Sequence, residues 1–239
     1  MNPGTVPGYN RLMRPLIRAA LAVLLAALSA RGLAAQGATF DEGTFVVTVN
    51  GAVVGKEAFR ILRSPGPNQL YTSTAQCAFG DRRISPALSA DRAGSPLLYR
   101  VEVKNGGDVE ERLQATGRPG RLHSVLQTRQ GESAKEYVVA SGAVILDDDV
   151  FHQYTFVPLA RRSGDVTVVV PRRNRQVTGR LEERGTDKIR VDGKEVTAVH
   201  LVITLPDGAR DLWFDDGGRL LKVAVPARGL TALREELPR

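Results

Sequence analysis

Three histidines and two groups of aspartates are the residues of this 239-residue chain best suited to chemistry. His123, His152 and His200 fall in no short metal-binding spacing, and the single cysteine, Cys77, is not near any of them. We expect His152 to cap a helix or bond the sheet, and His200 to be a hydrogen-bonded core residue. The histidines therefore predict no bound metal.

The aspartates have structural explanations. The run from Asp147 to Asp149 offers the oxygen ligands that Ca²⁺ prefers, but it lacks the glycine and the spaced second acid of a calcium loop. Capping a helix is the favoured interpretation. Asp211 and Asp215 share a strand face about 13 Å apart, too far for a pair of catalytic carboxylates, and Asp216 serves a turn.

Local signatures of catalysis are absent from the sequence, which has no G-x-S-x-G elbow, no P-loop and no G-x-G-x-x-G. A Ser-His-Asp triad assembles from distant segments, so the sequence neither predicts nor excludes one. We expect a protein that is not an enzyme and that carries no cofactor.

The stretch from Lys194 to Glu236 indicates the architecture. Strand-forming runs alternate here with turn signals at residues 206–208, 216–218 and 226–229. Strands joined this tightly are antiparallel neighbours, because a parallel return needs a dozen or more residues. The segment predicts an antiparallel meander.

Both faces of the first strand in this meander are apolar. One face carries Val199, Leu201, Ile203 and Leu205. The other carries Val196, Ala198, His200, Val202 and Thr204. A sheet with one face in water alternates more cleanly, so we expect part of this sheet to be covered on both faces.

The rest of the chain predicts further strands of one sheet. Asn50-Gly51 is typical of a tight hairpin between strands at residues 44–50 and 52–62. A third strand is expected at residues 70–79, followed by a less regular stretch at residues 80–94 that contains Pro86. No repeat or linker divides the sequence, so residues 37–239 are expected to form a single β-rich domain.

The segment at residues 146–162 breaks the strand period. Large apolar residues recur there at helical spacing, namely Val150, Phe151, Tyr154 and Val157. Pro158 disfavours helix at the residue before it, so we expect about two helical turns that end there, with or without a following turn. We expect this short helix to plug the doubly apolar sheet.

Residues 1–36 have the composition of a signal peptide. Arg11, Arg14 and Arg18 precede an apolar run of roughly ten residues, which is too short for a spanning helix, and small residues follow. We expect cleavage near residues 34–36 and a soluble protein in the periplasm or outside the cell; an uncleaved anchor is the alternative. No cysteine is placed near this segment for lipid attachment.

Charge argues against a nucleic-acid partner. The formal net charge falls from +7 to +3 without residues 1–36, because that segment holds four arginines and no acid. A charge this small indicates a solvated surface, although the basic clusters at residues 161–162 and 172–175 leave peripheral contact with anionic lipid open. With one cysteine there is no internal disulfide, and we expect Cys77 to be buried.

Three blocks of sequence resemble uncharacterised families of exported bacterial β proteins. They are FVVTVNGAVVGKEAFRI (residues 45–61), ILDDDVFHQYTFV (residues 145–157) and DLWFDDGGRLLKVAVPARGL (residues 211–230). Such proteins are similar in architecture to the Lol-type lipoprotein carriers, although the N-terminal helix of those carriers has no match here. The resemblance implies a mainly β fold: a strongly curved antiparallel meander sheet, an open half-barrel, wrapped around one short helix.

We expect the concave face of this sheet to bind or carry a hydrophobic ligand, such as a lipid or acyl chain. The candidate lining residues are Phe151, Tyr154, Val157 and Trp213. The alternative is a structural or interaction module of the cell envelope, with a protein partner, a filled core and no ligand. A pocket below roughly 300 Å³ favours that alternative.

Overall fold

The computed structural model describes Met1 and residues 37–238 of the chain. A compact folded unit spans Ala38–Arg239. Apart from Met1, the predicted signal peptide lies outside the described residues. Within the described part, no helix is both long enough and apolar enough to cross a membrane.

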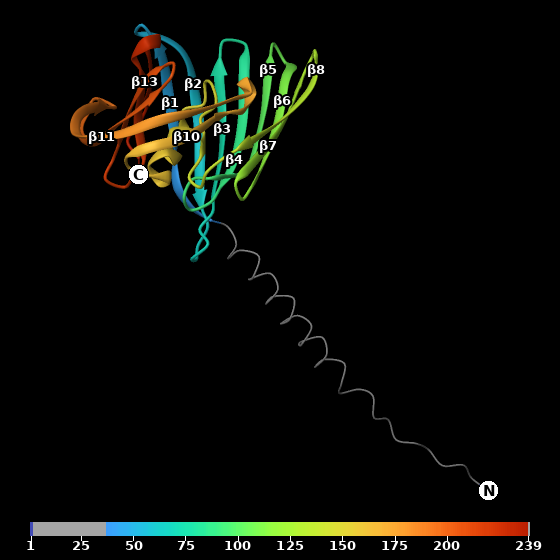
Figure 1. Cartoon of the computed structure of the whole chain (residues 1–239). Helices are drawn as coiled ribbons and strands as arrows, with labels where there is room; N and C mark the ends of the chain where they lie inside the picture. Colours follow the sequence, from blue (N-terminus) through green and yellow to red (C-terminus); the bar gives the residue numbers. More distant parts are fainter. Residues whose placement is uncertain (2–36, 239) are drawn as a thin grey trace. The chain divides into compact units, whose positions relative to one another are not determined.

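The folded unit is built on one sheet of 15 strands (Figure 1). In chain order the strands are β1 (Ala38–Val49), β2 (Ala52–Arg63), β3 (Tyr71–Phe79), β4 (Arg82–Ala90), β5 (Pro96–Asn105), β6 (Asp108–Arg118), β7 (Arg121–Thr128), β8 (Gly131–Val138), β9 (Val144–Ile145), β10 (Gly164–Val170), β11 (Arg175–Val191), β12 (Lys194–Leu205), β13 (Gly208–Phe214), β14 (Leu220–Val225) and β15 (Leu230–Arg234). Neighbouring strands are antiparallel except for β9 and β10, which pair in parallel.

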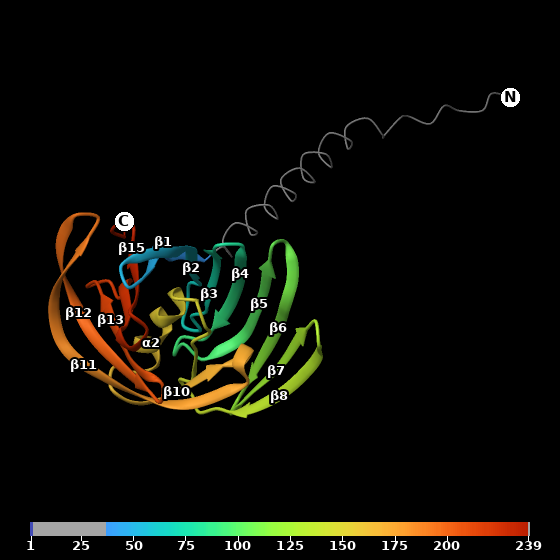
Figure 2. The same ribbon diagram turned by 90° about the horizontal axis from the view of Figure 1, so that it is seen from above.

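Pairing of the first strand with the last gives the sheet its wrapped shape. β1 lies beside β15, with Val49 opposite Leu230 and Phe45 opposite Arg234. From this join the sheet runs in both directions to the edge strands β8 and β9. The two arms curve around a central helical segment, drawn in yellow in Figure 2. The predicted mainly β fold, an open curved antiparallel sheet around a short helix, is confirmed.

Tight turns produce the meander as predicted. Asn50 and Gly51 take φ values of 50° and 83°, which a type I′ turn requires, so the first hairpin is confirmed. In the C-terminal stretch, β12, β13 and β14 pair consecutively through short turns, which confirms the predicted meander there.

Two strands continue through residues that often interrupt a strand, and β4 is therefore more regular than predicted. β4 continues through Pro86, which lies opposite Val101 on β5. The pairing of β3 with β4 is interrupted at Pro86, between Thr74–Ala87 and Cys77–Ile84, as expected for a residue that has no N–H to donate. β11 continues through Gly185, which forms a bulge with a φ of 94°.

The helical segment consists of two short helices in succession and lacks the predicted aspartate cap. A 3-10 helix, η1 (His152–Phe156), runs directly into a short α-helix, α2 (Val157–Ala160). Pro158 lies in the first turn of α2, where its missing N–H costs no helical bond, so the predicted helix is followed by one further short turn. The N-cap residues are Phe151 and Phe156, and neither side chain makes a capping hydrogen bond, so the predicted capping role of Asp147–Asp149 is wrong. Two further 3-10 turns, η2 (Pro171–Arg173) and η3 (Pro226–Arg228), follow β10 and β14.

Apolar clusters cover both faces of the C-terminal strands. The inner cluster, on the side of the helical segment, includes Leu201 and Ile203 of β12. The outer cluster consists of Val191, Ala198, Trp213 and Leu221, with partly buried neighbours. This confirms that part of the sheet is covered on both faces. The outer cover comes from the end of the β11–β12 hairpin rather than from the helix.

Candidate functional site

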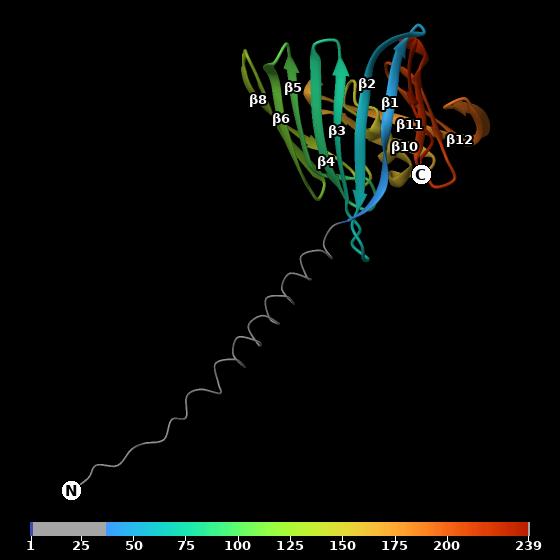
Figure 3. The same ribbon diagram turned by 180° about the vertical axis from the view of Figure 1, so that it is seen from behind.

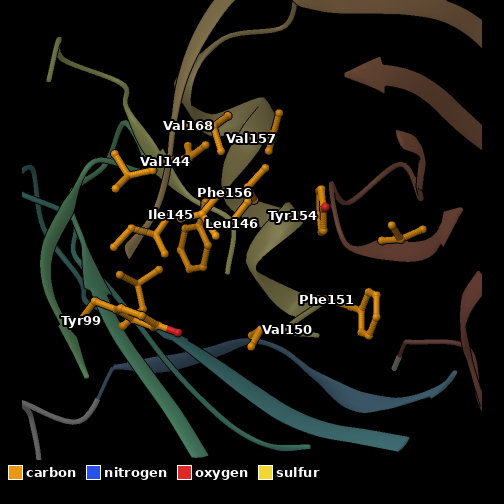
Figure 4. Close-up of a cluster of buried hydrophobic side chains, with 14 of the residues drawn as sticks. Tyr99, Val144, Ile145, Leu146, Val150, Phe151, Tyr154, Phe156, Val157 and Val168 are labelled. Atoms are coloured by element: carbon orange, nitrogen blue, oxygen red, sulfur yellow. The ribbon is translucent and has the colours of Figure 1, made fainter. Parts of the chain in front are cut away.

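The plug, defined as residues 146–160, brings three of the four predicted ligand-binding residues together. Phe151, Tyr154 and Val157 are 4%, 9% and 0% exposed, and all three belong to the inner cluster. In Figure 4 the side chains of Phe151 and Tyr154 project from one side of the plug, and that of Phe156 projects toward Ile145 on the other. The plug is therefore apolar on both sides.

The space beside these residues is small. A cavity of about 30 Å³ lies between the plug and the sheet, and Phe151 and Tyr154 line it with Leu205 and Val225. Val157 does not line it. A cavity of this size holds about one water molecule, whereas ligand pockets begin near ~300 Å³. The plug thus fills the concave side of the sheet.

Trp213 lies on the other face of the sheet from these three residues. It belongs to the outer cluster, whereas its neighbours Leu212 and Phe214 belong to the inner one. The indole stacks on His200 with ring centroids 4.7 Å apart, and Nε1 donates a hydrogen bond of 2.9 Å to Asp187. The four predicted residues therefore do not form one site.

His200 is held between two carboxylates on this outer face. Its Nδ1 lies 3.0 Å from Asp187 and its Nε2 lies 2.9 Å from Asp211. The expectation of a hydrogen-bonded histidine is confirmed. Among the described residues, no group of three or more His, Cys, Asp or Glu side chains is placed to hold a metal ion.

A buried polar network that the sequence analysis missed joins the plug to the sheet. Glu57 on β2 accepts hydrogen bonds from the backbone N–H groups of Phe151 (2.6 Å) and His152 (3.2 Å), and it also contacts Nδ1 of His152. Nε2 of His152 lies 3.0 Å from Oγ of Ser73 on β3. Glu57, Ser73 and His152 are each 0% exposed. The expectation that His152 bonds the sheet is confirmed.

The contacts run from Ser73 through His152 to Glu57, which is the arrangement of a Ser-His-acid triad. A nucleophile must reach its substrate, but these side chains line neither the cavity beside the plug nor the three larger hollows described below. The network instead fixes the start of η1 on two strands, and we call it the first tether. The sequence contains one indication of this network, because Glu57 alternates with Phe59 and Ile61 on the inward face of its strand.

A second tether holds the chain just before the helix. Asp147 accepts hydrogen bonds from Nε of Arg172 and from the hydroxyl of Tyr99, both at 2.7 Å. Burial raises the pKa of the Asp147 carboxyl, although Arg172 acts in the opposite direction. The next two aspartates pair with arginines nearer the surface, Asp148 with Arg173 and Asp149 with Arg82. The three aspartates therefore pin the plug to the sheet instead of capping the helix.

Larger hollows of the described residues lie away from the plug. One of about 370 Å³ lies beside the turn at residues 139–143, and one of about 550 Å³ lies between β1 and residues 235–238. The second contains a buried pair of Asp41 with Arg234, in which burial raises the pKa of the carboxyl. The largest of the four, about 570 Å³, lies on β4–β7.

We call this largest hollow the outer groove, because its polar lining points away from the plug. The lining comes from Ser85, Arg100, Glu102, Arg112, Gln114, Thr116, His123 and Gln127, with Val125 among them. These positions alternate along their strands with the buried residues of the inner cluster. The strands that carry it, β4, β5, β6 and β7, are consecutive in the sheet, and Figure 3 shows β4, β5 and β6 from behind.

Comparison with known proteins identifies the fold alone. No protein-family model matches the chain, and no curated protein matches it. A crystal structure of a beta-barrel-like protein of the domain of unknown function DUF1849 from Brucella abortus is similar, with a TM-score of 0.51 and 9% identity. The match covers 84% of this chain and 98% of that chain. The chain thus shares its architecture with a barrel-like domain of unknown function, and the likeness to Lol-type carriers stays a prediction.

Proposed function

We propose that this protein is a non-enzymatic binding module of the cell envelope, with a filled interior and a binding surface on the outer groove. One contrast carries the proposal: the cavity beside the plug measures about 30 Å³, and the outer groove measures about 570 Å³. Ligand pockets are concavities of roughly 300 Å³ or more. By that measure the outer face has room for a ligand and the interior does not.

Location in the envelope is part of this proposal. It is supported by the composition of residues 1–36, where a basic segment precedes a short apolar run. In the proposal this segment is a cleaved signal, and the mature protein is soluble, periplasmic or secreted, and free of a lipid anchor. The sealed position of Ser73 and His152, both 0% exposed, supports a role other than catalysis.

An interior lipid carrier is the second candidate. The curved sheet with its apolar inner face favours it, as does the resemblance to Lol-type carriers. An acyl chain could enter only after the plug left the sheet. That step would break the bonds of Glu57 and of Asp147 with Arg172, and buried groups that lose such partners cost several kcal/mol. The tethers therefore support the filled interior.

Native mass spectrometry tests the choice between the two. The protein is purified from the periplasm without detergent, and any bound molecule is extracted with organic solvent. We expect the apo mass, unchanged after incubation with phosphatidylethanolamine and phosphatidylglycerol vesicles. A stoichiometric lipid adduct would contradict the proposal and establish the carrier. Failure to recover processed protein from the periplasm would contradict the proposed location.

A further inference from the structure

We infer that the outer groove binds a small polar anion through a carboxylate or phosphate group received by Arg100. This inference rests on the proposed function, because it names the ligand class of the same groove. Four observations carry it: the register of the strands, the pairing of the charges, the neutral groups around them, and the absence of Phe, Tyr and Trp from the lining.

Strand register gathers the polar side chains of the groove. Arg100 on β5 lies opposite Gln114 on β6, and Thr116 of β6 lies opposite His123 on β7. Directly paired residues on one face of a sheet have Cβ atoms about 5 Å apart, and diagonal ones remain within reach of long side chains. The groove therefore presents a compact set of hydrogen-bonding groups on a rigid surface.

Arg100 is the cation available to a ligand. Its Nε donates a 3.0 Å hydrogen bond to Oε1 of Gln114, which is a neutral partner. Among the described residues, no carboxylate lies within ion-pair distance of its guanidinium, and its terminal nitrogens have no hydrogen bond. Arginine matches the geometry of carboxylate and phosphate groups with two parallel hydrogen bonds. An anion would supply the partner that the protein does not.

The acid of the groove is already neutralised. Glu102 forms 2.9 Å ion pairs with both Lys104 and Arg112. Hydrogen bonds from Lys104, and then from Arg112, lower the pKa of Glu102, so its negative charge is held by two cations. The lining therefore has two arginines and one acid, and the free positive charge is on Arg100.

The neutral polar groups and the lack of Phe, Tyr and Trp in the lining narrow the class of ligand. Ser85, Gln114, Thr116 and Gln127 offer uncharged donors and acceptors around Arg100. No Phe, Tyr or Trp side chain belongs to the lining, and His123 supplies its one aromatic ring, so the lining offers little surface for stacking on a large ring system. Recognition by charge and hydrogen bonds fits a small, highly polar anion.

Amide NMR titration of the purified protein with citrate and, separately, with inorganic phosphate tests the inference at constant ionic strength. We expect saturable shifts concentrated on the groove segments of β5, β6 and β7. Saturation by citrate alone identifies a carboxylate ligand, saturation by phosphate alone identifies a phosphate ligand, and either supports the site. Raising the salt concentration should weaken binding, because the charges are exposed.

Matched variants make the test specific. Arg100→Gln should weaken binding at least about tenfold, because a bidentate charge-assisted contact is lost. The control is Arg190→Gln on β11, which removes the same charge from an exposed residue that has no ion pair among the described residues. The affinity of this variant for the anion should match that of the native protein. No saturable shift with either anion, or equal affinity in Arg100→Gln, would overturn the inference.

The two proposals fail in different ways. If the protein has the apo mass and binds neither anion, the proposal of a filled interior stands and the proposed anion site is wrong. If the protein carries a stoichiometric lipid, and Arg100→Gln abolishes the anion-induced shifts in the groove, the anion site stands and the proposal of a filled interior is wrong.

Discussion

On the inner face of the sheet, the carboxylate of Glu57 meets two backbone N–H groups and an imidazole, whereas on the outer face the guanidinium of Arg100 meets one neutral amide. Both residues lie on strands of the same arm of the sheet. The inner group is completely enclosed, and its hydrogen-bonding capacity is used by the protein. The outer group is exposed, and much of its capacity is open.

This difference separates stabilisation from recognition. Enclosed polar groups must be satisfied internally, because an unpaired one in a low-dielectric interior is costly. Exposed groups carry no such constraint and can exchange water for a ligand at little cost. Alternation along each strand lets one sheet do both, with the tethers on one face and the outer groove on the other.

The largest expected effect concerns Cys77, which reports on whether the inner face is sealed. The thiol is 1% exposed and lies opposite Glu57 in the sheet. Burial raises the pKa of the thiol, with Glu57 acting in the same direction, so the reactive thiolate is suppressed. A disulfide reagent at pH 8 should label native protein at least ~10³-fold more slowly than urea-unfolded protein. Labelling rates within tenfold of each other would show that the interior is open.

Removal of the first tether should have the next largest effect. Glu57→Ala leaves buried N–H groups of Phe151 and His152 without an acceptor, so we expect a loss of about 4 kcal/mol in the free energy of unfolding. Urea denaturation measures it. The control is Glu195→Ala, which removes an exposed pair with Lys188 and should cost about 0.5 kcal/mol or less. Equal losses would show that the network does not hold the plug.

Phe151→Ala tests whether the plug packs as core or lines an open site. The side chain is 4% exposed, and truncation of a packed phenylalanine costs about 3 kcal/mol or more. Truncating a residue that lines a preformed empty pocket lowers the free energy of unfolding much less, because the contacts of that residue are already incomplete. A loss under about 1 kcal/mol in urea denaturation would favour the carrier.

On the outer face, Trp213→Phe should have a smaller effect. It removes the hydrogen bond to Asp187 and part of the stacking on His200, which together contribute about 1 kcal/mol. Denaturation curves followed by circular dichroism measure the change, since the variant lacks the sole tryptophan of the chain. A loss as large as that of Phe151→Ala would place Trp213 among the principal core residues.

The smallest effect on stability is expected for Arg100→Gln. The side chain is exposed and has one hydrogen bond, so the free energy of unfolding should change by less than about 0.5 kcal/mol. Thermal unfolding measures it beside the anion titration. A large destabilisation would mean that Arg100 supports the sheet, and its loss could not then be read as loss of a ligand contact.

Local patterns in the sequence predict much of the fold. Asn50-Gly51 predicts its hairpin because few dipeptides take positive φ at both positions. The apolar alternation of β12 predicts a sheet covered on both faces, and the departure from that period at residues 150–157 predicts the helical plug.

The tethers and the outer groove depend on contacts that no local pattern specifies. Glu57 and His152 are 95 residues apart, and Asp147 meets an arginine 25 residues away. Composition alone favoured helix capping for Asp147–Asp149, but competing arginines from η2 and β4 engage them instead. The outer groove depends on the register of β5, β6 and β7, and alternation identifies a face without fixing which residues lie opposite each other.

The most direct test of the filled interior is methyl NMR of the purified protein, with labelled isoleucine, leucine and valine. The protein is titrated with dodecanoate below its micelle concentration. Leu146 and Val157 of the plug and Ile145 of the adjoining β9 are 4%, 0% and 1% exposed, and their methyl groups report on the interior. A sealed plug predicts no shift at these methyl groups. Saturable shifts there would show that an acyl chain enters the interior and would contradict the account.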